Sequence, residues 1–500
     1  MNKSLLLGLS YLSLPFLIFA FSFLKLYLGI PLGIFLVYCI YKAAKESEEL
    51  YQLRLTQNQC VVLAILSLAL CYLSGIGAFY SQTGDYLVKN ALLRDLCNTS
   101  WPMYIDLEKE PLAVQNIIGH DKVAFVYYLF FYLPAALVGK CFGLLAARLT
   151  FLLWSSLGLY LVLLYTVSYV SKGEKIDRKT LFLMMALFLC FGGLDALGAI
   201  RKLHEFSVKE ILIQWPIFSF CETWCLPFFR LWGGNIHDLA FVFNQCIPAW
   251  LLTVLILRRD NNKSMFLVYS FSLLYTPWAA IGLFPIVIYL WLLDANKKWY
   301  SWRYIKETLN VRNVVFPLLL LFVVGSYYTS NSQSVGTKGW FFEFMSIGQF
   351  LVYYPLFLLV EIGLYAVLLR EQIKYIPILQ VSFMVLLALP FYHITPGNDL
   401  LMRASIPALF VIYVYWSKWA IDNFVSRKFL IVAVMLVTSV SAIQQTLVPM
   451  HLIAKEHKLH IVDPIGSFYH IQTPSEAYMC DFQFFAHDYK QKFFFKYLAK

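Results

Sequence analysis

Apolar stretches of membrane-crossing length recur from one end of the chain to the other, separated by short polar segments. A helix needs about 20 apolar residues to cross a bilayer. Because a backbone in lipid must satisfy its own hydrogen bonds, and because β-barrel strands are shorter and alternate in polarity, the pattern predicts helices. We expect thirteen spans, at residues 4–24, 27–43, 60–80, 144–170, 180–200, 237–257, 264–277, 280–294, 313–328, 344–369, 375–393, 404–421 and 429–449.

The composition agrees with this pattern. Of the 500 residues, 60% are hydrophobic and only 14% are charged, whereas soluble domains are nearer one-quarter charged. The first apolar run lacks a clear small-residue cleavage site and is followed at once by another, so we interpret it as a retained span. The sequence therefore predicts an all-α polytopic membrane protein with a transmembrane bundle over residues 1–449. The pair of runs at 264–294 is short, which favours a broken or re-entrant element.

Basic residues indicate the orientation of these spans. If the N-terminus is cytoplasmic, the short inner segments hold more than half of the 40 Lys and Arg residues, as the positive-inside rule requires. Segment 123–143 resembles a further span, but counting it would place the basic segment 171–180 outside. We therefore predict a helix lying in the outer interface at 123–143, and an ordinary fourteenth span is the alternative.

This orientation places the long polar segments outside, where we expect any chemistry. They are the first outer loop at 81–143, a second segment at 201–236, and an extracytoplasmic tail at 450–500, which we expect to pack against the outer loops. The net charge of +11 fits a protein with basic inner loops among membrane lipids and requires no nucleic-acid partner.

Asp85 lies a few residues beyond the third predicted span, and Lys89 and Arg94 follow it. A carboxylate at the lipid boundary loses part of its hydration, which makes it more basic and suits it to accept a proton. The acids farther along the first outer loop are interpreted as solvated. Asp85 is therefore the first candidate for a catalytic residue.

A second acid and further basic residues lie near the second outer segment. Asp195 interrupts an apolar run, and a charge there is costly enough to suggest a functional role, or it simply ends the helix. Arg201 and Lys202 follow it and are candidates for binding a phosphate.

A second polar cluster separates two late spans. His393, Asn398 and Asp399 precede Arg403, and Asn398 or Asp399 is suited to cap the next helix. Arg403 would lie about one turn inside that helix, where a guanidinium can bind a lipid phosphate through two hydrogen bonds. Pairing with Asp399, four residues earlier, is the alternative.

The order of these features resembles the GT-C superfamily of membrane glycosyltransferases, which includes protein O-mannosyltransferases and the lipid A aminoarabinose transferase. An acid follows an early span, a long first outer loop ends in "VGK" and "FG", and Arg148 with Leu149 opens the next span. The resemblance implies a bundle of about a dozen helices and an extracytoplasmic active site that takes sugar from a polyprenyl-phosphate carrier.

By this resemblance Asp85 is the catalytic base or a metal ligand, and Asp195 is the second acid. The family often has another acid directly after the first, whereas Tyr86 stands here, so the use of a divalent cation is left open. Strings such as "FGGLDALG" are similar to those of bacterial polytopic proteins, which favours a bacterial inner membrane.

The sequence thus predicts an inverting glycosyltransferase that moves a sugar from a polyprenyl-phosphate carrier to a glycan, lipid or protein acceptor. Two alternatives remain, an envelope polysaccharide polymerase or ligase and a flippase or transporter of lipid-linked sugars. Glu361, an acid within an apolar run, is the best evidence for a transporter.

Overall fold

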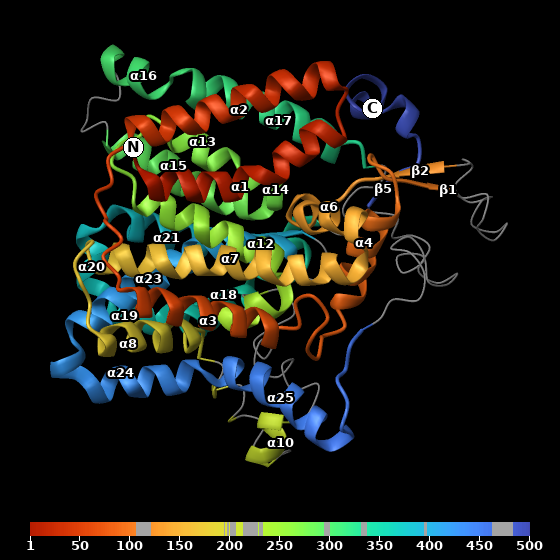
Figure 1. Cartoon of the computed structure of the whole chain (residues 1–500). Helices are drawn as coiled ribbons and strands as arrows, with labels where there is room; N and C mark the ends of the chain where they lie inside the picture. Colours follow the sequence, from red (N-terminus) through yellow and green to blue (C-terminus); the bar gives the residue numbers. More distant parts are fainter. Residues whose placement is uncertain are drawn as a thin grey trace.

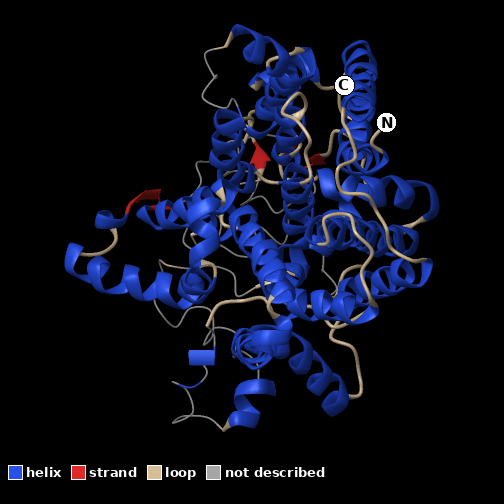
Figure 2. Cartoon of the chain, turned by 90° about the vertical axis from the view of Figure 1, so that its left-hand side faces the viewer, coloured by secondary structure: helices blue, strands red, loops and turns tan. Residues whose placement is uncertain are grey.

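The structure is a computed structural model, and helices make up most of it (Figures 1 and 2). It describes residues 1–106, 122–194, 196–197, 200, 207–213, 229, 234–294, 301–331, 338–394, 398–462 and 484–500. Strands form only short pieces of this described chain, in one three-stranded and one two-stranded sheet. The predicted all-α class is therefore confirmed at the level of secondary structure.

Most of the long helices lie side by side in one bundle (Figure 1). The first half of the chain contributes α1 (Lys3–Ser22), α2 (Leu26–Glu46), α3 (Gln57–Leu73), α7 (Leu144–Val170), α8 (Arg178–Leu189) and α12 (Asn235–Leu257). The second half contributes α13 (Met265–Ser270), α14 (Ser272–Tyr275), α15 (Pro277–Asp294), α17 (Val311–Tyr328), α18 (Ile347–Leu358), α19 (Leu364–Leu368), α21 (Pro377–Ala388), α22 (Asp399–Ala404), α23 (Ile406–Asp422), α24 (Phe424–Thr438) and α25 (Val440–Glu456).

Eight helices of the described chain are long and apolar enough to cross a membrane, and a ninth results if the bent pair α24 and α25 counts as one span. The other expected spans coincide with shorter helices, so the predicted number of thirteen is not confirmed. Local breaks explain the difference. Gly75 and Gly77 have positive φ directly after α3, Pro277 follows the end of α14, and Pro377 begins α21.

Helix α12 is the centre of the bundle. All of its residues are buried, and α7, α23, α15, α1 and α25 pack around it. A helix that is apolar on every side requires such a position. Its dihedral angles are non-helical at Val242, with φ −133° and ψ 32°, so two helical pieces meet there.

A small sheet covers one end of the bundle. Strand β2 (Lys122–Phe125) pairs with β1 (Tyr104–Asp106) on one side and with β5 (Phe485–Ala486) near the C-terminus on the other, all antiparallel. The tail therefore packs against the first outer loop in the described part of both segments. Strands β3 (Lys338–Trp340) and β4 (Tyr392–Ile394) form the second sheet.

The helix expected at residues 123–143 is wrong over its first ten residues. Val123–Phe125 belong to β2, and the α-helix α6 covers only Leu133–Phe142, after a short 3-10 turn. The backbone of β2 is paired with two partners, which excludes it from a helix, and Pro134 is suited to the first turn of α6. The inner face of α6 is buried against α7 and α4 (Tyr86–Asn98).

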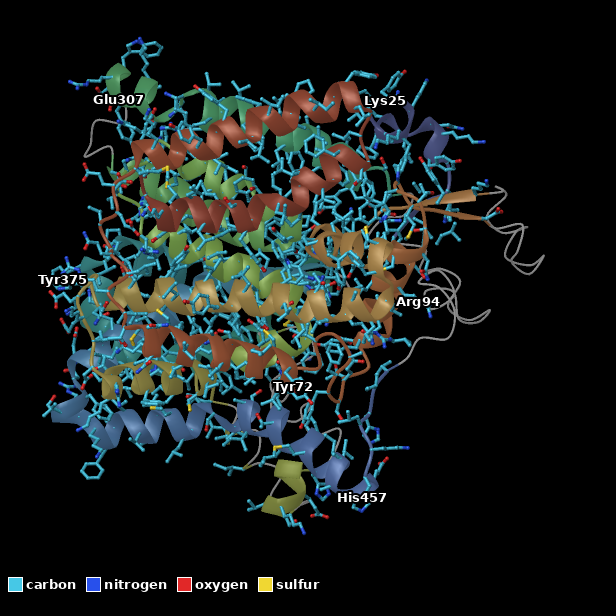
Figure 3. All side chains as sticks on the ribbon, viewed as in Figure 1. Lys25, Tyr72, Arg94, Glu307, Tyr375 and His457 are labelled. Carbon is cyan, nitrogen blue, oxygen red and sulfur yellow. The ribbon has the colours of Figure 1, made fainter. Side chains whose placement is uncertain are left out.

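The two ends of the bundle differ in the residues that they carry. Figure 3 shows Glu307 and Tyr375 at the end that contains the N-terminus, and Lys25, Arg94 and His457 at the opposite end. At the first end, Arg312 pairs with Glu46 at 2.7 Å and thereby ties α17 to α2.

Reporter fusions test whether these ends face opposite sides of a membrane. We expect fusions at Glu307 and Tyr375 to report the cytoplasmic side, because the basic inner segments lie at that end, and fusions at Arg94 and His457 to report the outer side. Paired alkaline phosphatase and green fluorescent protein fusions provide the measurement. The same reading at Arg94 and Tyr375 would contradict a membrane-crossing bundle with these two ends.

Candidate functional site

The loop after α3 places Asp85 at the start of α4. Gly75 and Gly77 have φ of 85° and 84°, which reverses the chain. The hydroxyl of Tyr86, which is fully buried, donates to the carbonyl of Ser74 at 2.7 Å and so anchors α4 to the end of α3. Asp85, one residue earlier, is exposed, so the expected loss of hydration does not distinguish it in the described chain.

Lys89 lies one helical turn after Asp85 and reaches into the bundle. Its Nζ donates to the carbonyl of Phe241, next to the break in α12 at Val242. The ammonium also lies over the rings of Tyr86 at 4.6 Å and Phe243 at 5.1 Å, within the range of cation–π interactions. Lys89 therefore links the first outer loop to the central helix.

Electrostatics place Asp85 and Arg403 near this amine. Burial lowers the pKa of Lys89 to about 8, the negative charge of Asp85 acts to raise it, and the positive charge of Arg403 acts to lower it. Since Asp85 and Arg403 both act on one amine, the structure brings together three charges from segments far apart in the sequence. All three were predicted site residues.

Arg403 is positioned by the short helix α22. Asn398 has the left-handed φ of 52°, and its side chain accepts a hydrogen bond from the backbone N–H of Leu401, so the predicted cap is Asn398. Arg403 Nη2 pairs with Asp399 Oδ1 at 3.1 Å. Its buried Nε has no hydrogen-bond partner in the part of the chain that the structure describes.

Close packing against α15 fixes the position of α22. A Cβ added to Gly282 would lie 1.8 Å from the carbonyl oxygen of Ala404, which is far too close for any other residue. Glycine at position 282 therefore allows α15 to contact the backbone directly after Arg403.

Two tyrosines within the segment 123–143, Tyr127 and Tyr128, are acted on by the same charges. Burial raises the pKa of Tyr127 to about 12, and the charges of Arg403, Asp399 and Asp85 all act on it. Burial also raises the pKa of Tyr128, whose hydroxyl receives a hydrogen bond from the indole of Trp278. In the sequence, only Pro277 before Trp278 and the adjacency of Tyr127 and Tyr128 could have indicated that these residues belong to the site.

Two other predicted residues are not among the groups that act on the Lys89 pKa. His393 is buried in β4, opposite Gly339 of β3, and its ring centroid is 4.8 Å from that of Phe344. Arg94 pairs with Asp95 at 3.7 Å. It follows Lys89 by five residues, which places it on a different side of α4.

Asp195, Arg201 and Lys202 lie outside the described residues, so their predicted roles stay predictions. Among the residues that the structure describes, no group of three or more His, Cys, Asp or Glu side chains could hold a metal ion. The proposed role of Asp85, the predicted first-loop acid, therefore depends on its charged neighbours.

Comparison with models of known protein families finds no match, and comparisons with curated proteins and with solved structures find none either. The resemblance to the GT-C superfamily thus rests on the order of features in the sequence alone.

The arrangement combines an exposed carboxylate with two cations. Asp85 can accept a proton, while Lys89 and Arg403 can hold an anion by charge-assisted hydrogen bonds. Tyr127 and Tyr128 add phenolic hydroxyl groups that can donate hydrogen bonds. Such a set suits a reaction in which a proton leaves one substrate while negative charge grows on another.

Titration of Lys89 tests directly whether Asp85 and Arg403 lie near its amine. We expect acylation of Lys89 to rise with pH around a midpoint near 8. Asp85→Asn should move the midpoint down, because a negative charge that favours the ammonium is lost, and Arg403→Gln should move it up. Quantitative mass spectrometry of pulse-acylated protein provides the measurement.

Arg94→Gln on the same helix is the matched control and should leave the Lys89 midpoint unchanged. Equal midpoints in wild type, Asp85→Asn and Arg403→Gln would show that the three charges do not share one site.

Proposed function

We propose that the chain is a membrane glycosyltransferase that moves a sugar from a polyprenyl-phosphate carrier to a hydroxyl acceptor on the extracytoplasmic side. The observation that carries this proposal is that Lys89, anchored to Phe241 of α12, is acted on by the charge of Asp85 on its own helix and by that of Arg403 on α22. The order of features that resembles the GT-C superfamily supports it as well.

In the proposed reaction the acceptor oxygen attacks the anomeric carbon of the donor sugar from the face opposite the phosphate. A carbon–oxygen bond forms to the acceptor, and the bond from the anomeric carbon to the phosphate oxygen breaks. The electron pair of that bond stays on the carrier phosphate, and the proton of the acceptor hydroxyl passes to Asp85. Polyprenyl phosphate and the glycosylated acceptor are the products, with inversion at the anomeric carbon.

Arg403 is suited to the leaving phosphate. Asp399 engages its Nη2 at 3.1 Å, while the buried Nε lacks a hydrogen-bond partner within the described chain. A phosphate oxygen would satisfy that N–H, and the charge-assisted bond would strengthen as the phosphate gains negative charge. Lys89 supplies a second positive charge, with a pKa of about 8 that leaves it largely protonated at neutral pH.

The position of the site also supports the proposal. Arg94, on the same helix as Lys89, lies at the end of the bundle opposite Glu307 and Tyr375 (Figure 3). If the basic segments face the cytoplasm of a bacterial inner membrane, this end lies outside. A carrier phosphate whose chain stays in the membrane would then meet the acceptor at the head-group level.

Asp85→Asn tests the proposed base. Asn is nearly the same size but cannot accept the proton, so we expect sugar transfer by the purified protein to fall by about two or more orders of magnitude. Asp106→Asn is the matched control, because Asp106 lies in β1 of the same outer loop, and it should retain transfer. Normal transfer by Asp85→Asn would remove the base from the proposal.

Arg403→Lys tests the proposed phosphate contact. Lys keeps the charge but loses the planar guanidinium, so we expect the KM for the carrier-linked sugar to rise by about tenfold or more, the loss of roughly one charged hydrogen bond. The KM for the acceptor should change little. Arg94→Lys is the control, and an unchanged carrier KM in Arg403→Lys would exclude the contact.

One observation favours a second candidate function, a transporter of lipid-linked sugars. Glu361 is only 7% exposed and lies in the π-helical turn Leu359–Gly363 within a membrane-length helix. It lines a small cavity together with Asp238 of α12. Buried acids and π-helical turns within membrane helices are frequent at functional sites.

Glu361→Gln distinguishes the two candidates. We expect the substitution to leave sugar transfer nearly unchanged, because the described lining of the Glu361 cavity includes none of Asp85, Lys89 and Arg403. A loss of lipid-linked sugar movement across proteoliposomes, with no transferase activity in the wild type, would favour the transporter instead.

A further inference from the structure

Two cavities adjoin each other between α3, α12 and α25. The outer one, of about 340 Å³, is lined by the loop Ser81–Gly84 and by α25, and the inner one, of about 290 Å³, reaches the end of α8. Four residues line both cavities, namely Leu73, Ser74, Ala240 and Gln445. Figure 1 shows α25 close to the end of α3 that leads toward α4.

Both cavities are lined mainly by apolar surface, and the outer one carries the larger share of polar surface. The outer cavity presents Ser81, Gln82, Thr83 and Gln444. The inner cavity is lined mainly by apolar side chains from four helices, Leu70, Leu189, Ile236, Ala442, Ile443 and Leu447. A ligand that fits this gradient has a polar group at the outer end and a hydrocarbon chain at the inner end.

The inner cavity is accessible from the side of the bundle. Leu73 of α3 and Ile443 of α25 line it and are 37% and 36% exposed. A chain can therefore enter sideways from the membrane between these two helices. Each cavity holds roughly ten times the volume of one water molecule, which suits one chain and part of a headgroup.

The outer end of the gradient does not suit an anionic headgroup. Among the described residues that line the two cavities there is no Lys or Arg. The one imidazole, His460, faces Glu456 at 3.1 Å, so its positive charge would be balanced. Ser81 and Gln82 already hydrogen bond within the chain, whereas the hydroxyl of Thr83 has no partner in the described chain and can pair with a hydroxyl group of a ligand.

We propose that these cavities bind the acceptor, a membrane lipid with an uncharged, hydroxyl-bearing headgroup, and that one of its chains enters between α3 and α25. This inference rests on the glycosyltransferase function proposed above and names its acceptor class. Gly84 lines the outer cavity and directly precedes Asp85, and a Cβ at Gly84 would meet open space. The lipid hydroxyl thus approaches Asp85 from the side of α25, whereas Arg403 approaches from α22.

Photo-crosslinking tests the site without requiring sugar transfer. The probe is a monoglucosyl diacylglycerol with a diazirine in one acyl chain, reconstituted with the full chain in nanodiscs. A phosphatidylglycerol with the same diazirine chain is the comparison. We expect the neutral probe to label peptides of α3 and α25 about tenfold more strongly than the anionic one, a difference of about 1.4 kcal/mol.

Two variants locate the labelling. Ala442→Trp fills the inner cavity and should abolish labelling of α3 and α25, and Thr446→Trp, at an exposed lining position, provides a second block if the first variant misfolds. Ala64→Trp adds the same bulk on the exposed face of α3, outside both cavities, and should label like the wild type.

Equal labelling by the anionic probe would overturn the neutral headgroup, and labelling that persists in both blocking variants would overturn the site. Asp85→Asn should still be labelled, since it removes only the proposed base. Wild-type protein that is labelled in α3 and α25 and transfers sugar to another acceptor, but not to the bound lipid, would overturn the acceptor role and leave the transferase proposal intact.

Discussion

A charged amine held against the central helix organises the end of the bundle that carries α4. Lys89 donates to the carbonyl of Phe241, beside the break in α12 at Val242. Because α12 is buried throughout, the contact ties the first outer loop to the most enclosed part of the bundle. A buried ammonium is costly unless it is paired, and the rings of Tyr86 and Phe243, with the nearby charge of Asp85, offset that cost.

The same contact explains why an exposed carboxylate can have a specific role. Asp85 lies one turn before Lys89 at the start of α4, so anchoring the amine also fixes the backbone that carries the carboxylate. In the proposed reaction the carrier phosphate would offset the charges of Lys89 and Arg403, and would leave Asp85 better able to accept a proton once the donor is bound. The donor would then bind first and proton transfer to Asp85 would follow, because of the charge balance within the site.

The sequence predicts the local features of this arrangement and misses the contacts between distant segments. Apolar length predicts the long helices, and residue type predicts a cap at Asn398 or Asp399, of which the structure has Asn398, and gives the Arg403–Asp399 pair as an alternative, which the structure contains. Strand β2 was mistaken for helix, because three apolar residues do not distinguish the two and the β5 partner lies near the C-terminus. The places of Tyr127 and Lys89 depend on the bend of α12 and the position of α22, which no local pattern encodes.

The most direct test of the central claim is a structure of the protein in nanodiscs with polyprenyl phosphate, determined by electron cryomicroscopy. The account predicts a phosphate within hydrogen-bonding distance of Arg403 Nε, the buried N–H without a partner in the described chain, with Lys89 and Asp85 beside it. A phosphate bound at the opposite end, near Arg312 and Glu46, with Arg403 still contacting only Asp399, would contradict it.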